Sequence, residues 1–267
     1  MTQSPHRIDP TGIDAYRPAE IARRIEEAGL AKAGLPLVQL VLLSILAGAF
    51  IALGAAAYTT VMTGAEPGSG AARLLGGVVF STGLILVIVA GAELFTGNAL
   101  IVMAWVDGLV GTAALLRNWV YAYAGNLVGA LVIAGLMAMA GLLAGGVGET
   151  AIAIAKAKMA LAWPEALARG ILCNVLVCLA VWLTFAARSA GDKILAIVPP
   201  ISAFVLLGYE HSVANMYFIP AAWAAGAPVD LQEFLANLVP VTIGNIIGGA
   251  GGVALTYRLA YRPKLRG

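Results

Sequence analysis

The stretch Gly-Tyr-Glu-His-Ser-Val-Ala-Asn, residues 208–215, places four polar side chains (Glu, His, Ser and Asn) inside an apolar part of the chain. The flanks, residues 194–207 and 216–225, are hydrophobic enough to lie in a bilayer. An ionisable residue at membrane depth is costly, so it usually faces a cavity and marks an ion or substrate pathway. His211 is also one of only two histidines in the chain, and histidine is the side chain suited to proton exchange near neutral pH. The stretch therefore predicts an interrupted membrane span with a functional histidine at its centre.

The composition assigns the chain to the membrane proteins. Of its 267 residues, 61% are hydrophobic and 11% are charged, and the mean hydropathy is +0.91. Soluble domains carry about 25% charged residues. The net charge of +2 gives no reason to expect a nucleic-acid partner. Cys173 and Cys178 lie five residues apart in one apolar run, a spacing that suits neither a metal site nor a disulfide, so we expect no metal and no cofactor.

The apolar segments predict an all-α membrane protein with six spans. A membrane-spanning helix needs about 20 mainly apolar residues. The segments that qualify are Pro36–Thr60, Leu74–Trp105, Trp119–Ala144, Gly170–Ala187, Ile194–Ala225 and Phe234–Tyr257. The second and fifth segments are too long for one straight span, and polar residues interrupt both. We therefore expect discontinuous second and fifth helices.

The placement of Lys and Arg predicts the orientation. With the N-terminus inside, twelve of these residues face the cytoplasm and four face the outside, as the positive-inside rule favours. We therefore expect a multi-pass protein of the inner cell membrane with both termini cytoplasmic, including a basic tail at residues 258–267. There is no apolar run typical of a cleavable signal peptide in the first 30 residues. Residues 1–34 form a cytoplasmic segment, in which residues 10–32 are interpreted as an amphipathic helix on the membrane surface or as a solvated cap.

Two pairs of matching motifs indicate an internal duplication. Glu93–Asn98 and Glu210–Asn215 both read Glu-x-x-x-x-Asn, and Gly125–Ala130 resembles Gly244–Gly249. The offsets of 117 and 119 residues keep the order and nearly the same spacing. We expect two repeats, at about 35–145 and 169–257, within one channel domain at 35–257. Each has three spans, so the repeats must be inverted, and the two breaks should face each other across a pathway.

Five ordered motifs carry a resemblance to a known family. They are residues 92–98, 125–126, 170–174, 208–216 and 240–245. Together these residues resemble the formate/nitrite transporter family over the length from the first span to the last. The resemblance implies an aquaporin-like protomer of six helices with its own pore, assembled as a homopentamer. It also implies a channel or transporter, not an enzyme, for small monovalent anions of weak acids, with formate favoured.

The resemblance also implies which residues line the pathway. The family's central histidine matches His211, and the threonine that faces it matches Thr96. Lys158 matches the lysine that draws anions into the outer vestibule, and Asn174 matches the asparagine of the fourth helix. The residues implied for the inner constriction are Leu84, Phe95 and Val177, and those for the outer one are Phe80 and Phe204. The loop residues interpreted as scaffold, because both repeats share them, are Glu93, Asn98, Glu210 and Asn215.

These residue types support a transport mechanism. A small carboxylate is costly to move through an apolar constriction as an anion. We therefore expect Lys158 to concentrate anions near the outer mouth, and His211 to donate a proton, directly or through Thr96, so that the substrate crosses as the neutral acid.

Other interpretations stay open. Nitrite and hydrosulfide fit the same pore. A channel for a neutral solute such as water or glycerol is a weaker alternative, because the chain lacks the paired Asn-Pro-Ala motifs of such channels. A membrane enzyme that uses His211 and Glu210 as acid and base is weaker still, because no nucleophile or metal-ligand set accompanies them.

Overall fold

The computed structural model describes residues 15–66 and 68–261, and every regular element in them is helical. The predictions for the start of the N-terminal segment (residues 1–14) and for most of the basic tail (residues 262–267) concern residues outside the described ones. Within the described part, five helical stretches are long and apolar enough to cross a membrane. They are α2 (Leu37–Met62), α3 with its π-helical end (Gly70–Gly91), α5 (Thr112–Met139), α7 (Trp163–Ala186) and α10 with its continuation to α11 (Leu231–Ala260). The predicted all-α membrane fold is confirmed.

The structure confirms that the second and fifth spans are broken. In the second span, α3 (Gly70–Ile85) passes through a π-helical turn (Leu86–Gly91), and the chain is then non-helical until a 3-10 helix (Gly97–Ile101) and α4 (Val102–Val106). The fifth span consists of α8 (Ala190–Leu206) and α9 (Ser212–Ala224), and neither piece alone is long enough to cross a bilayer. Gly91 and Gly208 adopt positive φ angles of 88° and 71°, which let the chain leave each helix.

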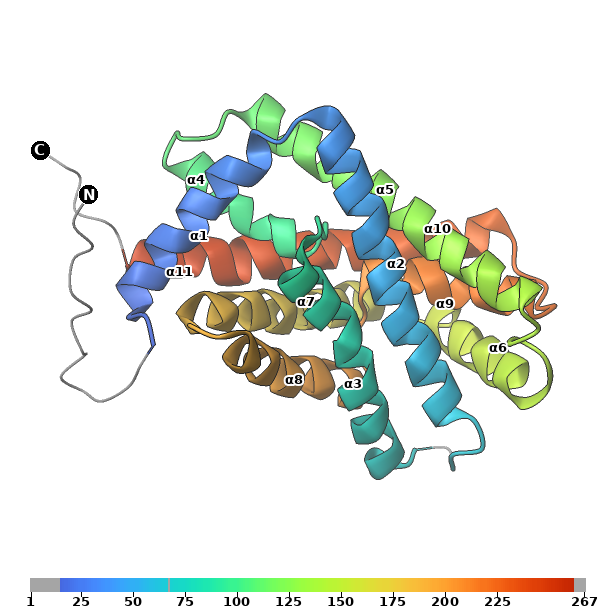
Figure 1. Cartoon of the computed structure of the whole chain (residues 1–267). Coiled ribbons are helices and arrows are strands. Elements are labelled where there is room, and N and C mark those ends of the chain that lie inside the picture. Colours follow the sequence, from blue (N-terminus) through green and yellow to red (C-terminus); the bar gives the residue numbers. More distant parts are fainter. Residues whose placement is uncertain (1–14, 67, 262–267) are drawn as a thin grey trace, which may run out of the picture.

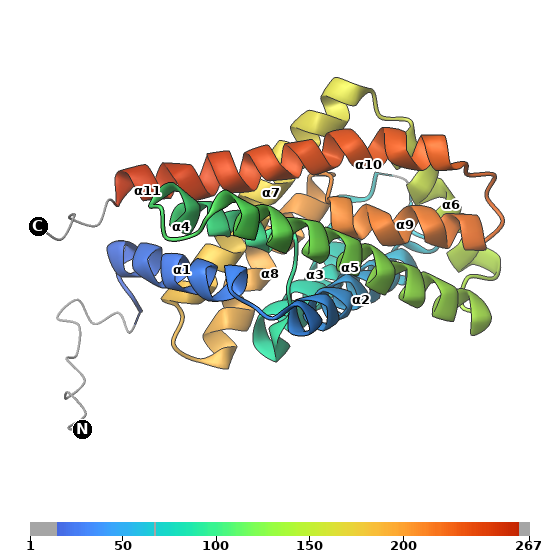
Figure 2. The ribbon, with the colours of Figure 1, turned by 90° about the horizontal axis from the view of Figure 1, so that it is seen from above.

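Two further helices mark the ends of the molecule. α1 (Pro18–Ala33) lies near α4 and α11 (Thr256–Ala260) at one end, and α6 (Gly145–Met159) lies at the other (Figures 1 and 2). The sequence reading assigns no helix to residues 145–159, so α6 is an addition to the predicted fold. Since α1 and α11 share one end, the described chain crosses the molecule an even number of times, as six spans require.

α1 uses its apolar face to pack against the chain itself. Ile21 and Ile25 are buried in a cluster with Ile101 and Met103 of the second span, while Arg23 is exposed. Burial of this face is favourable in proportion to the apolar area removed from water. One face of α1 is thus covered by the described part of the protein itself.

A carboxyl group on α1 makes this packing sensitive to pH. Burial, and then a hydrogen bond to the Asp107 carboxyl and the charge of that group, raise the pKa of Glu26 from 4.5 to about 7. Asp107 is in turn held by Arg258 of α11, whose Nε lies 2.5 Å from Asp107 Oδ1. Because the docked helix binds the proton more tightly, its stabilisation is complete below about pH 4.5 and is lost as the pH rises through about 7.

We therefore predict that α1 undocks more readily at pH 8 than at pH 5. Hydrogen exchange of the amides in residues 21–29, corrected for the intrinsic rate at each pH, should show less protection at the higher pH. Glu26→Gln should remove most of this pH dependence, because a glutamine side chain does not titrate. Glu27→Gln, a neighbouring exposed change, should leave the pH dependence intact. A pH dependence that survives in Glu26→Gln would contradict the assignment.

Small residues bring two helix pairs into close contact. Where α2 meets α5, a Cβ on Gly129 would lie 2.0 Å from the carbonyl oxygen of Ile45. Where α7 meets the π-helix (Ile247–Leu255) that continues α10 (Leu231–Ile246), a Cβ on Gly248 would lie 2.1 Å from the carbonyl oxygen of Ile171. Backbone atoms cannot yield as flexible side chains do, so these contacts require glycine. Such small-residue contacts are typical of helix packing in membranes.

Gly129→Ala is expected to destabilise the folded chain by about 1–3 kcal/mol or more, the cost of overpacking. Thermal unfolding in detergent should show this as a lower transition temperature. Gly135→Ala on the same helix is the matched control, because nothing lies within 4 Å of its added Cβ. That change should be neutral or stabilise α5 by up to about 1 kcal/mol. Equal transition temperatures for the two variants would show that the close contact has no energetic importance.

Candidate functional site

The two breaks meet at one hydrogen bond. Thr96 Oγ1 lies 2.9 Å from Nε2 of His211, and both side chains are buried. Thr96 directly precedes the 3-10 helix (Gly97–Ile101) that follows the first break, and His211 is the N-cap residue of α9 at the end of the second. The prediction that the breaks face each other is thus confirmed, and their meeting point joins the residues expected at the centre of the pathway.

The N-cap bond determines which ring nitrogen of His211 carries the proton. The backbone N–H of Ala214 donates to Nδ1 at 3.1 Å, so Nδ1 must present a lone pair. A neutral imidazole has one donor and one acceptor nitrogen. In this conformation the proton is therefore on Nε2, and Nε2–H donates to the hydroxyl oxygen of Thr96. The hydroxyl hydrogen of Thr96 is then free to donate to another acceptor.

Asn174 holds the backbone at this meeting point. Its Nδ2 donates to the carbonyl oxygen of Thr96 at 3.2 Å and to that of Asn245 at 2.6 Å. Asn174 is fully buried, and its Oδ1 has no hydrogen-bond partner among the described residues. The structure therefore places Asn174 behind Thr96, where it fixes the carbonyl of that residue.

A chain of polar contacts supports the first break. Lys32 Nζ lies 2.6 Å from Oε1 of Glu93. Asn98 Nδ2 donates to Oε2 of Glu93 at 2.8 Å and to Oδ1 of Asn118 at 2.9 Å, and Asn118 Nδ2 donates to the carbonyl oxygen of Lys32 at 3.1 Å. We call this closed loop of one Lys, one Glu and two Asn residues a polar frame. It leaves both carboxylate oxygens of a buried glutamate satisfied.

The same frame recurs at the second break. Lys158 Nζ lies 2.9 Å from Oε1 of Glu210. Asn215 Nδ2 donates to Oε2 of Glu210 at 2.7 Å and to Oδ1 of Asn237 at 2.8 Å, and Asn237 Nδ2 donates to the carbonyl oxygen of Lys158 at 2.8 Å. The recurrence of all four contacts supports the inverted repeat at atomic detail.

A further asparagine braces each break from outside its frame. Asn126 donates to the carbonyl oxygen of Glu93 at 3.0 Å, and its Oδ1 accepts the N–H of Phe95, two residues after Glu93, at 2.9 Å. In the same way, Asn245 donates to the carbonyl oxygen of Glu210 at 3.0 Å and accepts the N–H of Ser212 at 2.9 Å. Non-helical backbone at membrane depth needs such partners, because no lipid group can replace them.

The sequence reading missed three members of the frames: Lys32, Asn118 and Asn237. A signal for the two asparagines exists. Asn118 precedes Asn126 by eight residues, and Asn237 precedes Asn245 by eight, with the 119-residue offset of the repeat. Lys32 and Lys158 differ in position by 126 residues, so the repeat offset does not connect them.

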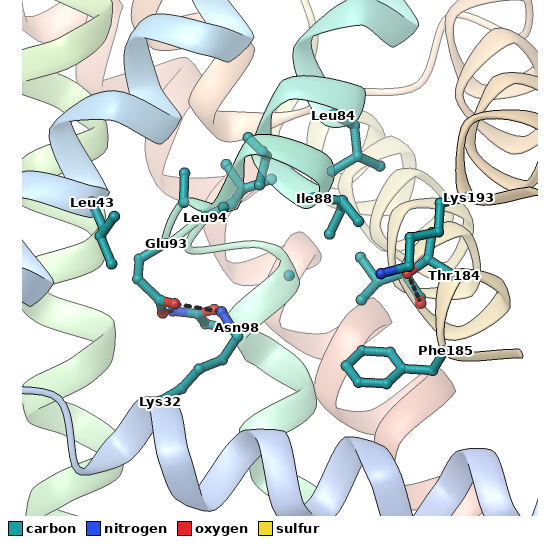
Figure 3. Close-up of a pocket in the computed structure, with 15 residues that line it drawn as sticks. Lys32, Leu43, Leu84, Ile88, Glu93, Leu94, Asn98, Thr184, Phe185 and Lys193 are labelled. Carbon is teal, nitrogen blue, oxygen red and sulfur yellow. Dashed lines mark hydrogen bonds and ion pairs between the residues drawn. The ribbon is translucent and has the colours of Figure 1, made fainter. Parts of the chain in front are cut away.

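Two cavities approach the His211–Thr96 pair from opposite ends. The α1-side cavity has a volume of about 410 Å³ and is lined by residues that include Lys32, Leu84, Glu93 and Lys193 (Figure 3). The α6-side cavity has a volume of about 630 Å³. Its lining includes Phe80, Lys158, Phe204, Glu210 and His211. Thr96 is not among the residues that line either cavity.

The residues expected at the constrictions belong to one buried apolar cluster. Phe80 and Phe204 pack edge to face with ring centroids 5.5 Å apart, and the Phe204 ring lies 6.1 Å from that of His211. Leu84, Phe95 and Val177 are buried in the same cluster. The His211–Thr96 pair thus lies beside a buried apolar cluster.

No group of three or more His, Cys, Asp or Glu residues in the described ranges is arranged to hold a metal ion. Cys173 and Cys178 are free and buried.

Comparison with known proteins places the chain among membrane transporters and channels. The profile of a family described as "Formate/nitrite transporter" matches residues 19–259. The chain is 44% identical over 254 residues to the "Uncharacterized transporter YrhG" of Bacillus subtilis, covering 94% of this chain and 95% of that one. It is 41% identical over 272 residues to the "Formate channel FocA" of Escherichia coli, covering 93% and 95%.

Solved structures give the same result. The chain resembles a "Pentameric formate channel with formate bound" with a TM-score of 0.78 and 39% identity, covering 85% of this chain and 98% of that one. It resembles an "FNT family ion channel" with a TM-score of 0.83 and 29% identity, covering 90% and 98%.

Proposed function

This chain belongs to the formate/nitrite transporter family, and we propose that within this family of membrane channels it carries formate. The observation that carries the proposal is the buried His211–Thr96 pair, which lies at the meeting point of the two breaks. Relatives named as formate channels support the substrate. The protein is a channel and not an enzyme.

Thr96 is proposed to donate a hydrogen bond to the substrate at the meeting point of the two breaks. Because Nε2–H of His211 donates to the threonine oxygen, the threonine hydroxyl has its hydrogen available for a carboxylate. Charge-assisted hydrogen bonds of this kind are roughly twice as strong as neutral ones. They offset part of the cost of bringing an anion into the apolar cluster.

Transfer of a proton to the substrate places a condition on His211. The ring must gain a proton on Nδ1 if it gives up the one on Nε2, since both nitrogens cannot be bare. Nδ1 can take a proton only if the N–H of Ala214 turns away. Proton donation and the N-cap of α9 therefore exclude each other, and we propose that the donating state of His211 is an uncapped one.

Flux into proteoliposomes tests the substrate. Formate, nitrite, hydrosulfide and glycerol would be supplied separately at pH 5.5 and 7.5, with empty liposomes subtracted. We expect formate flux well above that of empty liposomes at both pH values. Nitrite or hydrosulfide flux without formate flux would show that formate is not the substrate. Glycerol flux alone would overturn the proposal of an anion pathway.

We also propose that the α1 end is cytoplasmic, from the twelve-to-four distribution of Lys and Arg, and that the chain forms a homopentamer, which a solved relative described as pentameric supports. Protease access to tags on the two termini in inside-out and right-side-out vesicles tests the first point. Native mass spectrometry tests the second, and a monomeric mass would contradict it.

A further inference from the structure

The two broken spans begin alike. α3 and α8 are each capped by a serine, Ser69 and Ser189, whose side chain accepts a backbone N–H of its own helix at 3.3 and 3.1 Å. Four residues after each serine stands a cation, Arg73 in α3 and Lys193 in α8. Both the serines and the cations differ in position by 120 residues. The repeat therefore places one basic side chain at the start of each broken span.

Each of these cations lines one of the two cavities. Arg73 is exposed and lines the α6-side cavity, and Lys193 is half-buried and lines the α1-side cavity. In Figure 3, Lys193 reaches into the cavity from the side opposite Lys32, and the end of the Lys32 side chain is turned to Glu93. One cation of this pair thus lies at each end of the proposed pathway.

The other basic residues of the cavities are already engaged. Lys32 and Lys158 are paired with the glutamates of the polar frames. Arg169, in the α6-side cavity, forms an ion pair with Glu165 and donates to a backbone carbonyl. Within residues 15–66 and 68–261, neither Arg73 nor Lys193 forms an ion pair or a side-chain hydrogen bond with the protein. Their charges are not neutralised by a contacting carboxylate.

We propose that Arg73 and Lys193 concentrate the anionic substrate at the two mouths of the pathway, one at each end. This inference rests on the proposed function and extends it to residues that the polar frames do not include. A charge that no carboxylate offsets attracts anions over about 10 Å at 0.1 M ionic strength, whereas an ion pair presents mainly a dipole. Lys158 acts chiefly in its frame, and Arg73 supplies the attraction at that mouth.

A chemical probe of the local potential tests the proposal without any transport. Single cysteines, Ala157→Cys in the α6-side cavity and Ile88→Cys in the α1-side cavity, would react with an anionic and with a neutral methanethiosulfonate. The ratio of the two rates reports the local attraction of anions. The parent chain, whose own cysteines are buried, is the blank.

At 0.1 M salt, Arg73→Gln should lower the rate ratio about two- to fourfold at position 157 and leave position 88 unchanged, since the two positions line different cavities and salt screens each charge beyond about 10 Å. Lys193→Gln should do the reverse. Arg73→Lys and Lys193→Arg keep the charge and should keep the ratio. At 1 M salt, where the Debye length is about 3 Å, the differences should vanish. An unchanged ratio in both Gln variants at 0.1 M would overturn the proposal.

Formate flux at low ionic strength completes the test. A lower rate ratio together with lower formate flux supports the proposal, and a lower ratio with unchanged formate flux overturns the transport role of these cations. If the wild-type protein carries no formate while the ratios fall as expected, the proposed substrate fails and the anion-attracting mouths stand.

Discussion

His211→Asn should make formate transport fall more steeply with rising pH while keeping the fold intact. Asparagine is among the best N-cap residues, so its side-chain oxygen can accept the N–H of Ala214 that His211 Nδ1 accepts now. It cannot take up or give a proton. With no internal donor, formate must cross as neutral acid formed in solution, whose concentration falls about tenfold per pH unit above its pKa.

Wild-type flux should fall less steeply than that, because His211 supplies protons within the pathway. General acid catalysis typically contributes about 10²-fold or more, so at pH 7.5 we expect formate flux in His211→Asn to be lower by about that factor. The measurement is net formate uptake into proteoliposomes from pH 5.5 to 8, after subtraction of leakage through empty liposomes. The same slope in wild type and variant would show that His211 donates no proton.

His211→Ala is the matched comparison, because it loses both the cap and the proton donor. Loss of an N-cap costs about 0.5–2 kcal/mol, so its thermal transition should lie below those of wild type and His211→Asn. Its flux should show the pH slope of the asparagine variant. Equal stability of the alanine and asparagine variants would show that the contact with Ala214 has no structural importance.

Sequence patterns predict the breaks well and α6 poorly, for a physical reason. Residues 208–215 interrupt an apolar run with groups that lipid cannot solvate, so the break follows from composition alone. α6 has 15 residues, fewer than a span needs, and it packs against α9 and α2, which lie far from it in the sequence. A short helix held by distant partners leaves little local signal.

The same distinction applies to the site. The repeat predicts that the two breaks face each other, because it places them in inverted halves, and the family resemblance predicts that His211 faces Thr96. It does not predict that Lys32 pairs with Glu93, since the two lie 61 residues apart and no local spacing connects them. Only the fold brings that lysine to the glutamate. Lys158 is found by resemblance as an isolated cation, and the structure shows it in an ion pair with Glu210.

Glu210→Gln should strongly destabilise the protein. The change leaves Lys158, whose side chain is only 15% exposed, without its carboxylate. The amide oxygen of glutamine can still accept from Asn215, so the variant removes charge more than shape. Removing one partner of a buried ion pair costs about 3–5 kcal/mol, and we expect a loss in this range by denaturant or thermal unfolding in detergent. Glu93→Gln should cost less, because Lys32 is 32% exposed and water can solvate its charge.

The double variant Lys158→Met with Glu210→Gln separates the charge of Lys158 from its place in the frame. Replacing both members of a buried ion pair is often nearly neutral, so the double variant should recover most of the stability that Glu210→Gln loses. A double variant as unstable as Glu210→Gln would show that the frame needs the ion pair itself. If stability recovers while the anionic reagent reacts more slowly at Ala157→Cys, the attraction belongs to Lys158 and the assignment to Arg73 is wrong. If stability recovers and that rate is unchanged, Lys158 stabilises the second break, and Arg73 attracts the anion.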